Sequence, residues 1–81
     1  MHSIDIQLNN QAHSVPAGST ARDLIATHTS RALGEDGRAV DGSRLGVALA
    51  VNGAVLPRGK WASYALCAGD RLDIVTAAQG G

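Results

Sequence analysis

Residues 47–57 read VALAVNGAVLP, and this stretch carries the strongest fold signal in the chain. Over residues 47–51 the larger aliphatic side chains alternate with alanines, which is the two-residue period of a strand with one buried face. Asn52 and Gly53 both tolerate positive φ, as the two central residues of a tight hairpin turn must. Residues 54–56 therefore predict a short strand that pairs back on the first, and the proline that follows ends it.

A second hairpin is expected at the start of the chain. Apolar and polar residues alternate over residues 3–8, and residues 11–15 can return as the partner strand. Asn9 and Asn10 join the two strands, and asparagine accepts the positive φ of a two-residue turn. The chain therefore predicts two hairpins, one on each side of residues 16–46.

A single helix is expected between the hairpins, over residues 21–32. Thr20 offers a hydroxyl at the helix N-terminus and Asp23 follows three residues later, as in a capping box with Asp in place of Glu or Gln. Apolar residues then recur at the spacing of a helix that packs on a sheet. The residues expected on its inward side are Leu24, Ile25, His28, Ala32 and Leu33.

The other segments are interpreted from their turn residues and periodicity. Residues 34–46 are rich in glycine, so we expect an exposed, mobile connection without regular structure. Residues 59–66 indicate a helical turn that lays Trp61 over the edge of the core. Residues 71–75 alternate as a final strand.

This order of elements fits a known fold, although the order alone does not single it out. A mixed sheet of four to five strands that grasps one main helix accommodates it, so the expected class is α+β, the ubiquitin-like β-grasp. We expect one domain over residues 1–76, followed by a flexible tail over residues 77–81 that ends in diglycine.

Length and composition limit the class of protein. The 81 residues include seven basic and seven acidic side chains, with 44% hydrophobic and 17% charged residues. This balance is typical of a small globular domain, without the basic surface of a nucleic-acid binder or the apolar run of a membrane span. The first residues show no signal-peptide pattern, so we expect a cytoplasmic protein that is a monomer on its own.

Isolated side chains predict no catalytic or metal site. Cys67 is the single cysteine, and its neighbours offer neither a base nor a positive charge to stabilise a thiolate, so we expect it to pack. His2, His13 and His28 are far apart in the sequence and have no other ligand cluster beside them, so no metal ion is expected.

The chain ends at Gly80-Gly81, and this end is itself a candidate reactive group. Two residues without Cβ leave the terminal carboxylate on a thin, freely rotating backbone that can enter a narrow channel. The segment from Ala77 to Gly81 reaches about 17 Å when extended. An ionised carboxylate is a poor electrophile, so it needs activation before a nucleophile can replace one of its oxygens.

Several motifs occur together in this chain. They are Asn9–Gln11, Ala17–Thr20, Leu24-Ile25, Leu49–Gly53, Val55–Arg58, Trp61, Gly69–Arg71, Ile74-Val75 and Gln79–Gly81. In this combination the chain resembles the ThiS family of sulfur carriers in thiamine biosynthesis. Residues 29–46 depart from the family pattern, since typical members pass from the helix to the next strand with fewer residues.

The resemblance implies a route for sulfur through Gly81. A ThiF-like partner would adenylate Gly81 with ATP, since this chain has no phosphate-cradling glycine-rich loop of its own. The adenylate would become a thiocarboxylate, with sulfur that comes ultimately from a donor such as a cysteine desulfurase, and a thiazole synthase (ThiG-like) would accept that sulfur. The chain would be a co-substrate without a bound cofactor rather than an enzyme, and Gln79 and Gly80 would thread the tail into the partner.

Two charged residues and one sheet face are candidates for partner docking. Arg58 and Arg71 are interpreted as solvated surface charges that could contact the adenylating enzyme. Ala48, Ala50 and Val75 are expected on the outward face of the sheet, as an apolar docking patch or as ordinary exposed surface.

Other functions are compatible with the same fold and ending. One is the small subunit of molybdopterin synthase, but members of that group are rich in Phe and this chain has none. Another is a protein modifier joined to lysines, as ubiquitin is. A non-reactive binding module is a further alternative, and it would keep its activity without Gly80-Gly81.

Overall fold

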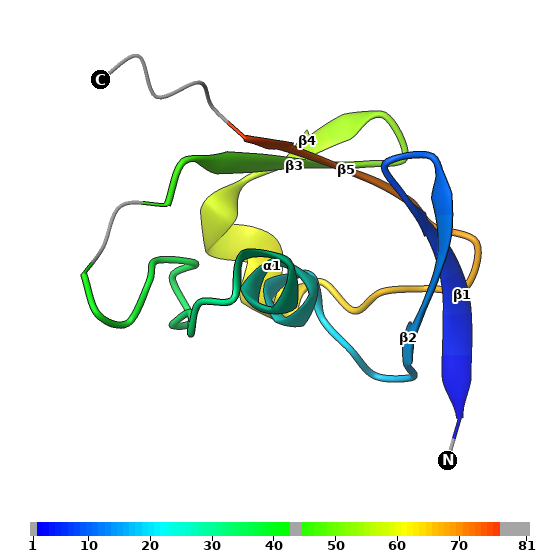
Figure 1. Cartoon of the computed structure of the whole chain (residues 1–81), viewed down its shortest axis with the longest axis horizontal. Coiled ribbons are helices and arrows are strands. Elements are labelled where there is room, and N and C mark those ends of the chain that lie inside the picture. The colour runs from blue at the N-terminus through cyan, green and yellow to red at the C-terminus, as the bar shows by residue number, and fades with distance from the viewer. Residues whose placement is uncertain (1, 43–44, 77–81) are drawn as a thin grey trace.

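The computed structural model describes residues 2–42 and 45–76. This part of the chain forms a five-stranded sheet, one α-helix and one 3-10 helix (Figure 1). The strands are β1 (Ser3–Leu8), β2 (Gln11–Pro16), β3 (Val47–Val51), β4 (Ala54–Leu56) and β5 (Arg71–Thr76). The helices are α1 (Ala21–Thr29) and η1 (Arg58–Ser63).

The sheet is mixed, and β5 lies at its centre in the order β2-β1-β5-β3-β4. β5 runs parallel to β1 and antiparallel to β3, whereas the β1–β2 and β3–β4 hairpins are antiparallel. Both α1 and η1 lie on the same side of the sheet (Figure 1). This arrangement confirms the predicted ubiquitin-like β-grasp.

Both predicted hairpin turns are present. Asn9 and Asn10 have φ angles of 50° and 68°, and Asn52 and Gly53 have φ angles of 52° and 89°. Positive φ at both central residues defines the type I′ turn, whose twist matches that of the flanking strands. The strands follow the predicted ranges, and β2 and β5 each run one residue further than expected.

The helix α1 begins where predicted and ends earlier. The Thr20 hydroxyl accepts a hydrogen bond from the Asp23 N–H at 3.2 Å, and the Asp23 carboxylate accepts one from the Thr20 N–H at 2.9 Å, so the capping box is complete. The predicted end at residue 32 is wrong because Ser30 adopts the left-handed conformation, with a φ of 58°. Its N–H then closes the last helical turn.

The buried side of α1 is confined to its first half. Leu24 and Ile25 are buried as predicted, and Ala21 is buried as well. His28 and Ala32 are exposed, so their predicted inward positions are wrong, whereas Leu33 is half-buried against the core. The difference arises because the last turn of α1 lies beyond the buried residues and stays in solvent.

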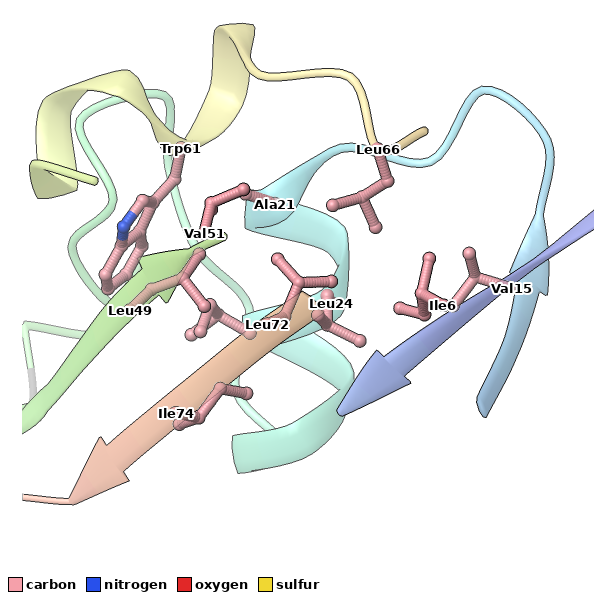
Figure 2. Close-up of a cluster of buried hydrophobic side chains, with 11 residues drawn as sticks. Ile6, Val15, Ala21, Leu24, Leu49, Val51, Trp61, Leu66, Leu72 and Ile74 are labelled. Atoms are coloured by element: carbon pink, nitrogen blue, oxygen red, sulfur yellow. The ribbon is translucent and has the colours of Figure 1, made fainter. Parts of the chain in front are cut away.

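Apolar side chains from the sheet, α1 and η1 meet in one core (Figure 2). Trp61 is 1% exposed, and its indole N–H donates a hydrogen bond to the Leu56 carbonyl at 3.1 Å. The prediction that Trp61 covers the edge of the core is therefore confirmed, and loss of such a ring typically costs about 3–5 kcal/mol. The predicted helical turn over residues 59–66 is shorter than expected, since η1 ends at Ser63.

The segment between α1 and β3 is irregular but has structure of its own. Ala39 is buried and forms a β-bridge with Leu33, and the Val40 N–H donates to the Ala32 carbonyl at 2.8 Å. The expectation of a fully exposed connection is therefore wrong for the part of residues 34–46 that the structure describes. Its mobility stays a prediction.

Cys67 is exposed, so the predicted packing of its thiol is wrong. The backbone of this residue is what faces the protein, because its N–H donates a hydrogen bond of 2.9 Å to a buried carboxylate oxygen of Asp70.

Candidate functional site

The strand β5 delivers the C-terminal segment from the middle of the sheet. Thr76 is the last described residue, and it pairs with Val47 at the start of β3. β1 pairs with Arg71 and Leu72 at the start of β5, whereas β3 pairs with β5 as far as Thr76, so β3 is the strand that holds the end of β5. Gln79, Gly80 and Gly81 lie outside the described residues, so the roles predicted for them stay predictions.

Two asparagine side chains hold β5 from opposite sides. Asn9 Oδ1 accepts a hydrogen bond from the Ile74 N–H at 2.9 Å, and Asn52 Oδ1 accepts one from the Arg71 N–H at 2.8 Å. Both asparagines also occupy the positive-φ positions of the hairpin turns. Their turn roles are evident from the sequence, but the bonded partners lie 65 and 19 residues away and give no local signal.

Asp70 is the buried charged residue of the described chain, and it anchors the start of β5. Its Oδ2 accepts hydrogen bonds from the Tyr64 hydroxyl at 2.8 Å and the Cys67 N–H at 2.9 Å, and its Oδ1 accepts one from the Asn52 amide at 3.1 Å. Burial acts to raise the pKa of Asp70, but these three donors hold it below its ordinary value of 3.8. An ionised carboxylate therefore fixes the turn that leads into β5.

The pKa of Tyr64, which donates a hydrogen bond to this carboxylate, is shifted upward instead. Burial first, and then the hydrogen bond to Asp70, raise the pKa of Tyr64 to about 12. At neutral pH the phenol is therefore protonated and the carboxylate is ionised. The pair stabilises the fold, and it lacks the intermediate pKa that a general acid or base needs.

An apolar patch lies on the outward face of the sheet, and we define it as Ala48, Ala50, Val55 and Val75. Ala48 is opposite Val75 and Ala50 is opposite Val55 in the strand register, so the four side chains point away from α1. Val55 is 76% exposed and Val75 is 61% exposed. The predicted outward positions are confirmed, and Val55 is an additional member; docking at this patch stays a prediction.

The guanidinium of Arg58 is used inside the protein. Arg58 is half-buried; its Nη1 donates to the Gly37 carbonyl at 3.2 Å, and its Nη2 donates to the carbonyls of Leu45 at 2.8 Å and Val47 at 3.3 Å. It also lies 5.0 Å from the centre of the Trp61 ring, within cation–π range. The expected solvated charge is therefore wrong, because the guanidinium makes three hydrogen bonds to backbone carbonyls of the protein, and its role in docking stays a prediction.

Arg71 differs from Arg58, since its side chain is exposed as predicted. It lies on the outward face, on the same side of β5 as Val75. Arg71 can therefore meet a partner that covers the apolar patch, and such contact stays a prediction.

The described residues place no metal-binding group and no membrane span around this region. They contain no group of three or more His, Cys, Asp or Glu side chains that could hold a metal ion. No helix in residues 2–42 or 45–76 has both the length and the apolar character needed to cross a bilayer. The candidate site is the end of β5, with the outward patch beside it.

Comparisons with known proteins agree with this arrangement. The sequence model of the ThiS family matches residues 6–81. Solved structures also match; one is the crystal structure of a thiamine biosynthesis protein (ThiS) from Geobacter metallireducens, with 20% identity and a TM-score of 0.62. That match covers 96% of this chain and 100% of the other, and at this identity it shows the shared fold. No curated protein matches the chain.

Proposed function

This chain belongs to the ThiS family, and we propose that it is the sulfur carrier for thiazole formation in thiamine biosynthesis. The terminal carbonyl carbon of Gly81 carries the sulfur. The chain acts as a co-substrate of other enzymes rather than as an enzyme. It works in the cytoplasm and is a monomer until a partner binds. The observation that carries this proposal is the family match through the final Gly80-Gly81.

The chemistry proceeds in two displacements at Gly81. A carboxylate oxygen of Gly81 attacks the α-phosphorus of ATP, and pyrophosphate leaves, which gives an acyl-adenylate. A sulfide-level nucleophile then attacks the carbonyl carbon, the bond to AMP breaks, and a thiocarboxylate remains. Activation is needed because an ionised carboxylate carries no leaving group of its own.

Partners supply each activity that the chain lacks. Its sequence has no phosphate-cradling glycine-rich loop, so ATP is bound by a ThiF-like adenylating enzyme. A cysteine desulfurase provides the sulfur indirectly as a persulfide, which a thiol reductant brings to the sulfide level, and a ThiG-like thiazole synthase accepts it from Gly81. The central position of β5 supports this division, because a rigid body that holds the root of a short tail can present Gly81 to successive active sites.

The test is an intact-mass measurement on the full chain. Incubation with the adenylating partner, ATP and bisulfide should add about 16 Da, because sulfur replaces one oxygen. The chain without Gly80-Gly81 should gain no mass. The exposed Cys67 needs its own control, because a persulfide on that thiol would add about 32 Da and would be absent from Cys67→Ser.

Two results would contradict the proposal. Isopeptide adducts of Gly81 with lysines of other proteins would instead identify a protein modifier. Copurification with a molybdopterin synthase large subunit, together with failure to gain sulfur from the ThiF-like partner, would identify the small subunit of that enzyme.

A further inference from the structure

The parallel pairing between β1 and β5 stops before β5 does. The Gln7 N–H donates to the Asp70 carbonyl and the Asn9 N–H donates to the Leu72 carbonyl, each at 2.9 Å. Beyond Asn9 the chain turns back into β2, whereas β5 continues to Thr76. The end of β5 therefore has a neighbouring strand, β3, on one side alone.

The side chain of Asn9 supplies one further hydrogen bond to this ladder. In a parallel ladder one residue donates its N–H to the opposite strand and accepts a hydrogen bond from the residue two positions later on that strand. Asn9 donates its own N–H to Leu72, but its side-chain Oδ1, rather than its carbonyl, accepts from the Ile74 N–H at 2.9 Å. Asn9, a turn residue just beyond β1, thus provides the last hydrogen bonds of the β1–β5 ladder.

The next position of the ladder would use the Ile74 carbonyl and the Thr76 N–H. Alternate residues of a strand direct their backbone groups to the same side, so these two groups face the β1 side, as those of Leu72 do. Among the described residues neither group has a hydrogen-bond partner. Ile74 as a whole residue is 7% exposed, and unpaired backbone groups at the edge of a sheet are a template for pairing with another chain.

We propose that the protein that activates Gly81 adds an extended strand beside Ile74 and Thr76, parallel to β5. One residue of that strand donates its N–H to the Ile74 carbonyl and accepts from the Thr76 N–H. A parallel strand is selected because an antiparallel pair centred on Ile74 would need the Ile74 N–H, which Asn9 already holds.

The identity of the occupant follows from the position of this edge. The chain that ends at Gly81 continues directly from Thr76, so a protein that encloses Gly81 passes within about 17 Å of the open edge. Exposed strand edges bind extended peptides through main-chain hydrogen bonds. The inference rests on the proposed function, since it takes the adenylating enzyme as the partner.

Two substitutions at Thr76 form the first test. Thr76→Pro removes the N–H that faces the β1 side and leaves the β3–β5 hydrogen bonds intact, whereas Thr76→Ala keeps the N–H. Affinity for the ThiF-like partner, measured by calorimetry, should fall about 3- to 10-fold for Thr76→Pro and stay within about 2-fold for Thr76→Ala. Equal affinities for the two variants would overturn the inference.

Amide hydrogen exchange of the unmodified chain is the second test, and it does not depend on how a variant folds. The Thr76 N–H should exchange at least about 10-fold more slowly in the complex than in the free chain. If the Thr76 N–H exchanged at the same rate in the complex while Gly81 was still adenylated, the strand pairing would be overturned and the proposed function would stand. Absence of adenylation would instead overturn the proposed function, and protection of Thr76 in a self-associated chain without the enzyme would overturn the choice of occupant.

Discussion

The hydroxyl of Tyr64 donates a hydrogen bond of 2.8 Å to Oδ2 of Asp70, and this bond ties the end of η1 to the start of β5. Tyr64 is half-buried and Asp70 is buried, so the bond lies in a region of reduced dielectric where an unpaired partner is costly. The strand that leads to the C-terminus thus begins at a charged anchor.

Replacement of the hydroxyl should weaken this anchor. Tyr64→Phe is expected to lower the free energy of unfolding by about 1–3 kcal/mol, because a donor to a buried charge is lost. Urea denaturation at neutral pH measures the change. Ser63→Ala is a matched control, since its hydroxyl donates to the Lys60 carbonyl at an exposed site, and it should cost less than about 1 kcal/mol.

The same substitution has a signature at alkaline pH. The pKa of Tyr64 is raised to about 12 from 10.0, so the stability that this phenol contributes is complete below pH 10 and is lost as the pH rises toward 12. The difference in stability between the unmodified chain and Tyr64→Phe should therefore shrink over this range. A constant difference would contradict the assigned bond.

Asp70 should make stability depend on pH in the acidic range. Its pKa is lowered from 3.8 in the folded chain, so its contribution is complete above that value and is lost as the pH falls from there through the lower pKa of the folded chain. Asp70→Asn is expected to destabilise the fold by about 2–3 kcal/mol at neutral pH, because its amide group would face a donor. Thermal unfolding from about pH 6 to about pH 3 should show a smaller loss of stability for Asp70→Asn.

The control for Asp70 is an exposed acid on β1. Asp5→Asn should leave both the neutral-pH stability and its acid dependence close to those of the unmodified chain, because Asp5 is exposed. If Asp5→Asn and Asp70→Asn changed the acid dependence equally, the buried carboxylate could not be its source.

Asn52 and Asn10 are two of the turn asparagines, and they offer a comparison of side-chain bonding at similar φ. Asn52→Gly keeps positive φ accessible but removes the bonds to the Arg71 N–H and to Asp70, so we expect a loss of about 1–2 kcal/mol. Asn10→Gly also relieves a positive φ, of 68°, and should change stability by less than about 0.5 kcal/mol. Chemical denaturation measures both, and equal effects would show that the Asn52 side chain does not brace β5.

The elements of the fold were predictable because their signals are local. Asn52-Gly53 specifies a hairpin by its own backbone preference, and Thr20 with Asp23 marks a helix start within one turn. The helix end was not predictable from residue type, since Ser30 has no strong intrinsic preference for the left-handed region.

The polar contacts around the site could not be predicted, because they join distant segments. The sequence places Arg58 between a strand and a helical turn, and nothing nearby indicates that it binds the carbonyls of Gly37 and Leu45. From its sequence context Asp70 is likewise interpreted as a turn residue, because Asn52 and Tyr64 contact it only in the folded chain. Side-chain bonding of this kind follows from tertiary structure rather than from local pattern.

The segment between α1 and β3 packs closely on η1 at Gly37, so a larger residue at this position should destabilise the fold. A Cβ at Gly37 would lie 2.6 Å from the Arg58 carbonyl oxygen and 3.2 Å from Trp61, and φ is +78°. Gly42 has the same φ of +78° with no atom within 4 Å of an added Cβ, so it isolates the cost of the backbone conformation. Gly42→Ala should cost about 1–2 kcal/mol.

Gly37→Ala should cost more than Gly42→Ala by at least about 1–3 kcal/mol, because overpacking adds to the same backbone strain. Both values come from urea denaturation followed by Trp61 fluorescence. Equal costs for the two alanines would mean that the connection does not pack against η1.

The apolar patch should contribute to partner affinity in proportion to the area that it buries. Val75→Thr keeps the shape and strand preference of the side chain and replaces a methyl by a hydroxyl, so the fold should be retained. We expect affinity for the adenylating partner to fall about 3- to 10-fold, which corresponds to roughly 1 kcal/mol of lost apolar burial. Val40→Thr is the matched control, since Val40 is 69% exposed but lies outside the sheet, and it should bind within about 2-fold of the unmodified chain. Calorimetric titration distinguishes the two, and an unchanged affinity for Val75→Thr would place the partner on a surface other than the outward face of the sheet.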